Sequence, residues 1–264
     1  MKLFLIPITK RRALIYAQQL GKLATEKPSL LDRVTSKAAL TWAQWERGEK
    51  KWQRTLVEAG NKALRRIPYE EWGLKSIPTL SSRKKQSELQ EAKIGVIYPP
   101  SVIHGRDIHS IIRQLATERA ALHRSRLWWS IIGMPIVAPL ALVPLIPNIP
   151  FFYLAFRAYS HWKALEGGKH LEFLLTNNLL IPVPSMELDA IYKKNKIRCK
   201  EQLQTHGNTN SPNSDPILIN DNDAQMVAKT LQVPGLAGEL ERAHNQVLLE
   251  RKAHQRQLEP KKEI

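Results

Sequence analysis

The sequence has a single cysteine, Cys199, so the chain can form no internal disulfide. This excludes the disulfide-stabilised secreted scaffolds and is typical of a reducing compartment such as the cytosol or the mitochondrial matrix. Acidic residues are also missing from the N-terminal part, where the first carboxylate is Glu26. An acid-poor, basic start is typical of a mitochondrial targeting region, and the same residues also fit the first elements of a folded domain.

Motifs for nucleotide binding and for nucleophilic catalysis are missing as well. The sequence contains no phosphate-binding Gly-rich loop, no dinucleotide-binding turn and no GxSxG motif. We therefore expect neither an enzyme nor a bound cofactor. His104 and His109 flank Asp107 in the stretch HGRDIH. No cysteine lies near them and the carboxylate is better explained as a helix cap, so we expect no metal site.

Positive charge, by contrast, is abundant and unevenly placed. The chain has 40 Lys and Arg against 24 Asp and Glu, for a net charge of +16. Residues 1–126 hold 25 basic and 11 acidic residues and so account for +14, whereas residues 163–264 hold 14 and 13. A basic face of this size attracts nucleic acid, anionic lipid or an acidic partner. Because the basic residues lie beside an apolar segment, we expect their partner to be an anionic phospholipid such as cardiolipin rather than nucleic acid.

An apolar segment over residues 127–156 contains no charged residue and meets the length criterion for a membrane-spanning helix. Five prolines interrupt it, and the sequence Pro-Asn-Ile-Pro around Asn148 is typical of a turn. This pattern favours a membrane-embedded helical hairpin over residues 127–166 rather than a single crossing. The aromatic residues expected to anchor both helices at one membrane interface are Trp128, Trp129, Tyr159 and Trp162.

The predicted fold is mainly α, with a long helical N-terminal region, a Pro-rich membrane helical hairpin, a flexible linker and a small C-terminal helical tail. Apolar periodicity predicts N-terminal helices over residues 12–23 and 31–64, and Gly167 and Gly168 are expected to break or cap a helix. A minor two-stranded β element pairs residues 2–8 with residues 94–98. The predicted parts are a basic helical domain (1–126), the membrane hairpin (127–166), short helices (167–200), the flexible linker (201–218) and the helical tail (219–264).

The sequence resembles the mitochondrial K⁺/H⁺ exchange-related membrane proteins over most of residues 1–181. The stretches that carry the resemblance are MKLFLIPITKRRALIYAQ, DRVTSKAALTWAQWE, NKALRRIPYEEWGLKSIP, GVIYPPSVI and LVPLIPNIPFFYLAFRAYSHWKALEGGKHLEFLL. The resemblance implies an inner-membrane protein linked to exchange of K⁺ and H⁺, and it transfers no ion-binding residue. It also implies that the basic start belongs to the domain itself.

Four polar residues of the hairpin are candidates for a role in transport or in headgroup binding: Asn148, Tyr153, Arg157 and His161. The last three are spaced i, i+4, i+8 and share one helix face. His161 is suited to carry a proton because its ordinary pKa lies near physiological pH. Arg157 repels K⁺ and is better suited to a phosphate headgroup or a carboxylate. The structural alternative is that Arg157 and His161 only anchor the helix at the interface.

We therefore expect a mitochondrial inner-membrane protein, with its soluble regions in the matrix, that takes part in potassium/proton exchange and matrix cation homeostasis. One hairpin cannot enclose an ion path and the apolar segment holds no carboxylate, which favours a subunit or regulator over a sole carrier. Such a protein is expected in a homo-oligomer or a larger membrane complex. The alternative is a membrane-anchored scaffold that binds anionic lipid or an assembly or ribosomal partner.

Overall fold

The computed structural model of the chain describes residues 1–18, 37, 40, 43–47, 51–90, 93–139, 149–205 and 215–258. The chain divides into two compact units. The first combines Met1–Gln18 with Tyr69–Ile264, and the second is Gln19–Pro68. The second unit is therefore an insertion between two parts of the first.

The first unit contains a four-stranded mixed sheet in the order β2-β1-β3-β4. Strand β1 pairs antiparallel with β2, from Lys2 opposite Gln18 to Pro7 opposite Ala13. It pairs parallel with β3 on its other side, and β3 pairs parallel with β4. The strand bounds are β1 Lys2–Pro7, β2 Ala13–Gln18, β3 Ile94–Tyr98 and β4 Leu180–Pro184.

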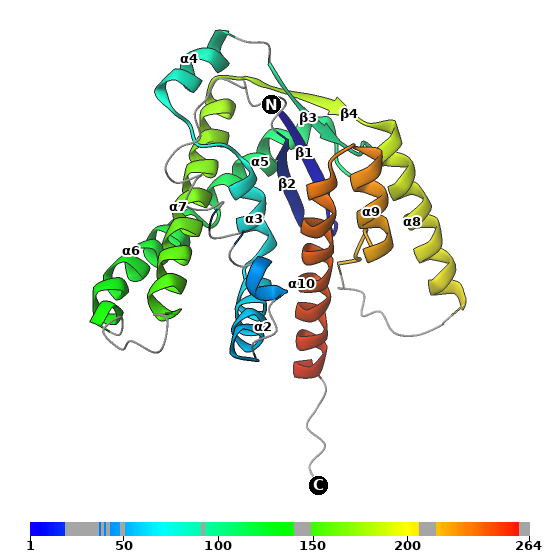
Figure 1. Cartoon of the computed structure of the whole chain (residues 1–264). Coiled ribbons are helices and arrows are strands. Elements are labelled where there is room, and N and C mark those ends of the chain that lie inside the picture. The colour runs from blue at the N-terminus through cyan, green and yellow to red at the C-terminus, as the bar shows by residue number, and fades with distance from the viewer. Residues whose placement is uncertain are drawn as a thin grey trace. The chain divides into compact units, whose positions relative to one another are not determined.

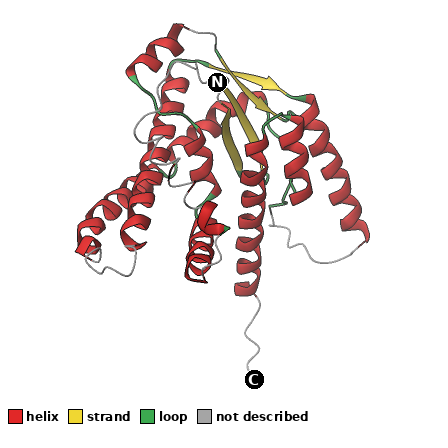
Figure 2. Ribbon diagram, in the orientation of Figure 1, coloured by secondary structure: helices red, strands yellow, loops and turns green. Residues whose placement is uncertain are grey.

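The helices of the first unit follow from Tyr69 onwards and pack on both sides of the sheet (Figures 1 and 2). A 3-10 turn, η1, covers Gly105–Asp107. The helix bounds are α3 Tyr69–Ser76, α4 Ser82–Gln90, α5 Ile108–Thr117, α6 Ala120–Val137, α7 Ile149–Thr176, α8 Met186–Thr205, α9 Asp221–Thr230 and α10 Pro234–Leu258.

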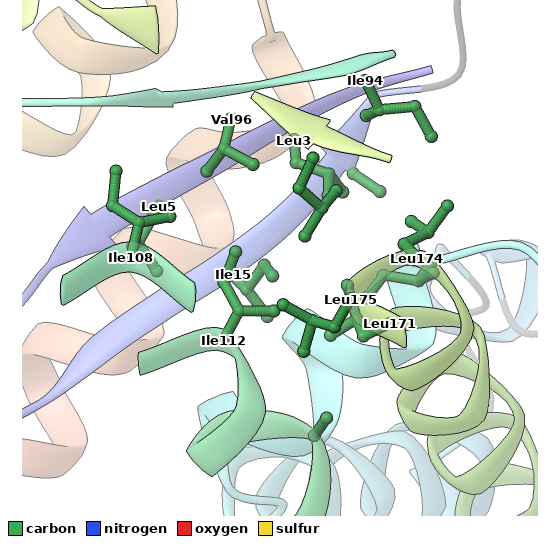
Figure 3. Packing of buried hydrophobic residues seen from close by; sticks show 14 of the residues in the cluster. Leu3, Leu5, Ile15, Ile94, Val96, Ile108, Ile112, Leu171, Leu174 and Leu175 are labelled. Carbon is green, nitrogen blue, oxygen red and sulfur yellow. The ribbon is translucent and has the colours of Figure 1, made fainter. Parts of the chain in front are cut away.

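Strand β1 is buried on both faces and separates two hydrophobic clusters. Successive side chains of a strand point to opposite faces, so Leu3 and Leu5 pack on one side of the sheet, with residues of α5 and α7 (Figure 3). Phe4 and Ile6 pack on the other side, with residues of α8, α9 and α10. Because β1 contributes to both clusters, the sheet is the middle layer between two layers of helices.

The expected pairing of residues 2–8 with residues 94–98 is confirmed, because Leu3 lies opposite Val96 and Phe4 opposite Ile97. The prediction of a mainly helical N-terminal region with only this minor β element is wrong, since the pair forms the centre of a four-stranded sheet. The predicted helix over 12–23 is also wrong, because its residues 13–18 form β2. Leu14 and Ile15 are buried in the two different clusters, which is the alternation of a strand and not the spacing of a helix.

The prediction of a membrane hairpin over residues 127–166 is not supported. Among the described residues, none of the helices combines the length and the apolar character needed to cross a membrane. The charge-free residues are divided between two helices: residues 127–137 end α6, whose first half contains Arg124 and Arg126, and residues 149–156 begin α7. The two helices pack along each other, with Gly133 of α6 close to Leu154 of α7.

Helix α7 runs through Gly167 and Gly168 without interruption, so the predicted break at these glycines is wrong. The glycines allow neighbouring backbone to approach the helix. A Cβ atom at Gly167 would lie 2.1 Å from the carbonyl oxygen of Leu74 in α3, and one at Gly168 would lie 2.8 Å from that of Ala116 in α5. The glycine pair thus marks a close contact of three helices rather than a helix end.

The predicted tail, residues 219–264, is part of the first unit. The buried faces of α9 and α10 pack with Ile6, Ile8 and Leu14 of the sheet. Within the predicted flexible linker, α8 continues to Thr205, and Ile217 forms an antiparallel bridge with Thr9. The middle of that linker, residues 206–214, lies outside the described residues. The C-terminal helices therefore cover one face of the sheet instead of extending from the domain.

The described part of the second unit contains α2, Lys51–Arg65. Asn61 on this helix donates a hydrogen bond from Nδ2 to Oε1 of Glu46, at 3.3 Å. Helix α2 covers the last part of the predicted helix over 31–64, most of whose earlier residues lie outside the described ones.

The close contact at Gly167 gives a stability prediction. Gly167→Ala should lower the free energy of unfolding by about 1–3 kcal/mol, because the added methyl group overlaps the backbone of Leu74. The matched control is Gly238→Ala in α10, where a Cβ atom meets nothing within 4 Å. That change should leave stability unchanged or raise it by up to about 1 kcal/mol through helix propensity. Urea unfolding, monitored by circular dichroism, measures the free energy of unfolding of both variants. Equal effects of the two substitutions would contradict the close packing of Gly167 against Leu74.

Candidate functional site

The candidate site is built around α3, the short helix of the stretch YEEWGLKS. Its two glutamates, Glu70 and Glu71, stand in the first turn, where a negative charge interacts favourably with the helix dipole. Helix α3 packs against β2 on one side, since a Cβ atom at Gly73 would lie 2.4 Å from the carbonyl oxygen of Ile15. It packs against α7 on another side through Leu74 and Gly167. These contacts fix the position of Glu71 inside the protein.

Glu71 is fully buried and accepts hydrogen bonds from two residues of α7. Arg157 binds the carboxylate in a bidentate manner, with Nη1 3.0 Å from Oε1 and Nη2 3.3 Å from Oε2. The hydroxyl of Ser160 donates to Oε1 at 2.6 Å. Residues 157, 160 and 161 share one face of α7 because their spacing is i, i+3, i+4. A buried carboxylate is thus held by a planar guanidinium and a hydroxyl, a strong charge-assisted arrangement.

Two buried histidines continue this network. Nη2 of Arg157 lies 2.9 Å from Nε2 of His161, and Nδ1 of His161 lies 3.0 Å from Nδ1 of His123 in α6. Arginine only donates, so Nε2 of His161 is an acceptor and its proton sits on Nδ1, from which it is donated to His123. The proton of His123 is then on Nε2, a buried atom with no hydrogen-bond partner among the described residues. The network therefore ends in an unsatisfied donor.

The charges of the cluster follow from burial and from the neighbours. Burial alone would raise the pKa of Glu71, but the hydrogen bond from Ser160 and the charge of Arg157 outweigh it and hold that pKa below its ordinary value. Burial lowers the pKa of His161 to about 4 and also lowers the pKa of His123. At neutral pH the cluster consists of one carboxylate, one guanidinium and two neutral imidazoles, and its net charge is zero.

The residues on either side of Glu71 bind other helices. Glu70 lies 3.1 Å from Arg119, the residue that precedes α6. Two cations contact the ring of Trp72, with Nζ of Lys75 at 3.6 Å and the guanidinium carbon of Arg242 in α10 at 4.3 Å from the ring centroid. Burial lowers the pKa of Lys75 to about 8. Three successive residues of α3 therefore reach the start of α6, the middle of α7 and the side of α10.

A second buried polar pair joins α4 to α7. Nε2 of His170 lies 2.6 Å from Oε2 of Glu88, and Nδ1 of His170 lies 2.8 Å from the carbonyl oxygen of Pro78. Both partners accept hydrogen bonds, so His170 is held by two fixed acceptors. This pair contributes to the packing of α7 and lies apart from the cluster of Glu71.

The structure separates the residues predicted as one candidate site. Arg157 and His161 are buried in the cluster, whereas Tyr153 on the same helix is exposed. Asn148 lies outside the described residues. Arg157 binds a carboxylate, which is one of the two ligand types expected for it, while its predicted role in transport stays a prediction. Among the predicted interface anchors, Trp128 and Trp129 are exposed, and Tyr159 and Trp162 are half-buried with ring centroids 5.9 Å apart.

Sequence reasoning did not identify Glu71, His123 or Ser160. Glu71 is 86 residues before Arg157, and His123 is 38 residues before His161. One available signal was the sequence EEWG, where two carboxylates precede a glycine in a stretch otherwise rich in apolar residues.

The possible metal ligands of the cluster are Glu71, His123 and His161, which place one donor atom each within 4.8 Å of one another. In HGRDIH, by contrast, His104 and Asp107 are exposed and 4.0 Å apart.

Comparison with known proteins gives one family and two relatives. Residues 2–175 match the family described as mitochondrial K⁺-H⁺ exchange-related. An uncharacterised protein of Saccharomyces cerevisiae is 26% identical over 94% of this chain and 84% of its own length. An uncharacterised protein of Schizosaccharomyces pombe is 28% identical over 65% of this chain and 74% of its own length. No solved structure matches the chain.

The buried ion pair gives the sharpest prediction for this site. Glu71→Gln should lower the free energy of unfolding by about 3–5 kcal/mol, because it leaves the guanidinium of Arg157 buried without a counter-charge. The control is Glu70→Gln, which removes a more exposed ion pair from the same helix turn and should cost about 1 kcal/mol or less. Urea unfolding at neutral pH compares the two variants. Similar losses for both would show that Glu71 contributes no more than a surface charge.

Proposed function

Because the chain belongs to the mitochondrial K⁺-H⁺ exchange-related family, we propose that it is an accessory, non-enzymatic subunit or regulator of potassium/proton exchange rather than the sole carrier. The family description associates the chain with mitochondria and with this exchange. The observation that supports the accessory role is the state of the buried carboxylate, Glu71, whose two oxygens are both bound by Arg157.

A carrier for K⁺ needs oxygen ligands that can receive the ion and release it. The carboxylate of Glu71 is occupied by a guanidinium that is itself a cation and would repel K⁺ at short range. His161, the predicted proton carrier, accepts a hydrogen bond from the same guanidinium, and burial lowers its pKa to about 4. These groups are therefore arranged to hold α3, α6 and α7 together, which suits a subunit that supports or regulates an exchanger.

An exposed apolar patch suggests where this subunit acts. The patch comprises Trp128, Trp129, Ile132 and Ile136, which follow one another along α6 and are all more than half exposed. Arg124 and Arg126, one turn earlier on α6, are also exposed. Tryptophans beside arginines are typical of surfaces that lie in the headgroup region of an anionic bilayer. We propose that this patch docks on the matrix face of the inner membrane, against anionic phospholipid such as cardiolipin.

The same patch favours a second candidate function, a lipid-bound scaffold whose effect on potassium is indirect. Such a scaffold would bring an assembly partner or a second copy of the chain to the membrane surface. The two candidates share the docking surface and differ in whether potassium/proton exchange depends directly on the protein. They are separated by measuring ion exchange and lipid binding independently.

Mitochondria that lack the protein should lose most of their potassium-dependent swelling in potassium acetate, which reports exchange of K⁺ for H⁺. Purified chain in potassium-loaded vesicles should give no flux above empty vesicles, because its buried carboxylate is already neutralised. Flux from the purified chain alone would contradict the accessory role. Normal swelling without the protein would favour the scaffold.

Lipid docking is tested by flotation with vesicles that contain cardiolipin. The variant Trp128→Ser with Trp129→Ser should lose most binding, because two exposed aromatic side chains leave the patch. The control, Met226→Ser with Leu249→Ser, removes two exposed apolar side chains from α9 and α10 and should bind as the wild type does. If both variants float equally well with the vesicles, the patch does not bind lipid. If the wild type is a dimer and the tryptophan variant is a monomer, the patch is a surface for self-association.

A further inference from the structure

Three side chains of the cluster around Glu71 are of the types that bind transition metals. Glu71, His123 and His161 come from three different helices, and their residues are 0%, 2% and 1% exposed. One possible ligand atom from each lies within 4.8 Å of the other two. Nδ1 of His123 is 3.0 Å from Nδ1 of His161, which is 3.8 Å from Oε2 of Glu71.

These distances are close to those of a single tetrahedral site. Zinc binds imidazole nitrogen at about 2.0–2.1 Å, so neighbouring ligand atoms are separated by about 3.4 Å. One of the two distances is shorter than this value and the other is longer, and the third pair of ligand atoms, on His123 and Glu71, lies within 4.8 Å. Side-chain shifts on the order of 1 Å would therefore place all three atoms around one ion. Two imidazoles and one carboxylate leave the fourth position to a water molecule.

The ligand set also indicates the class of ion. Imidazole nitrogen suits zinc and its first-row neighbours, whereas Mg²⁺ and Ca²⁺ prefer oxygen ligands. We propose that Glu71, His123 and His161 form a binding site for one divalent transition-metal ion of the zinc class. This site goes beyond a role in potassium/proton exchange and does not depend on that role.

Arg157 is the built-in competitor of such an ion. A metal on Nδ1 of His161 moves the imidazole proton to Nε2, which lies 2.9 Å from the donor Nη2 of Arg157. Two N–H donors cannot form a hydrogen bond with each other, so the guanidinium of Arg157 has to move away from Nε2 of His161. Arg157 is suited to do so, because its side chain is 11% exposed whereas that of Glu71 is 1% exposed. The ion then neutralises Glu71 in place of the guanidinium.

The test uses the full chain after treatment with a chelator. Calorimetric titration with Zn²⁺ should show that one ion binds per chain. Binding of Co²⁺ should give the visible absorption of a tetrahedral site. Zn²⁺ should also raise the melting temperature. His123→Gln and His161→Gln should each weaken binding by more than about 100-fold, because removal of a group that only supports a ligand already costs about 10–100-fold.

Two further variants keep the proposal falsifiable if a histidine variant fails to fold. Arg157→Met should bind Zn²⁺ more tightly than the wild type and should gain more thermal stability from it, because the competitor is gone and Glu71 is unpaired. His104→Gln, in the exposed stretch HGRDIH, should bind as the wild type does. The proposal is overturned if the wild type binds no stoichiometric Zn²⁺, if Arg157→Met binds less tightly, or if His104→Gln abolishes binding.

Discussion

The buried ion pair between Glu71 and Arg157 is the interaction on which the arrangement of the helices depends. Moving a carboxylate and a guanidinium out of water costs several kcal/mol per ion, and only good geometry and further hydrogen bonds offset this cost. Both conditions are met, because the pair is bidentate and Ser160 donates to the same carboxylate. The pair fixes α3 against α7, and Gly167 of α7 allows this approach, while Gly73 of α3 allows the approach of α3 to β2. Glu70 and Trp72 then extend the contacts of α3 to the start of α6 and to α10.

Some of this arrangement could be predicted from the sequence. The pairing of β1 with β3 was predicted from two short apolar stretches, and Arg157 and His161 were singled out as the polar residues of an apolar segment. Their partners were not found, because contacts across 86 and 38 residues depend on how α3 and α6 pack against α7. The apolar segment itself contains no carboxylate. This gave no indication of the buried ion pair, because α3 supplies the carboxylate from outside the segment.

Two errors have a common physical cause. The apolar segment alone predicts a membrane hairpin, and Gly167 and Gly168 alone predict a helix break, because neither pattern contains information on the elements that pack against it. The apolar residues lie on two helices that pack against each other, α6 and α7, and glycines also occur where backbones meet inside a helix bundle. Much of the described apolar segment stays exposed, including Trp128, Trp129, Ile132 and Ile136. A surface of this kind fits a subunit that binds a membrane or a partner, while the polar cluster maintains its internal structure.

The role of the ion pair is tested most directly by a double-mutant cycle with Glu71→Gln, Arg157→Gln and the double variant, each unfolded in urea. Adjacent residues of one buried network couple by about 0.5–3 kcal/mol, and a bidentate buried pair should fall near the upper end. We expect a coupling free energy of about 2–3 kcal/mol, with the double variant more stable than the sum of the single losses predicts. A coupling free energy near zero would contradict the assignment of this pair as the contact that joins α3 to α7.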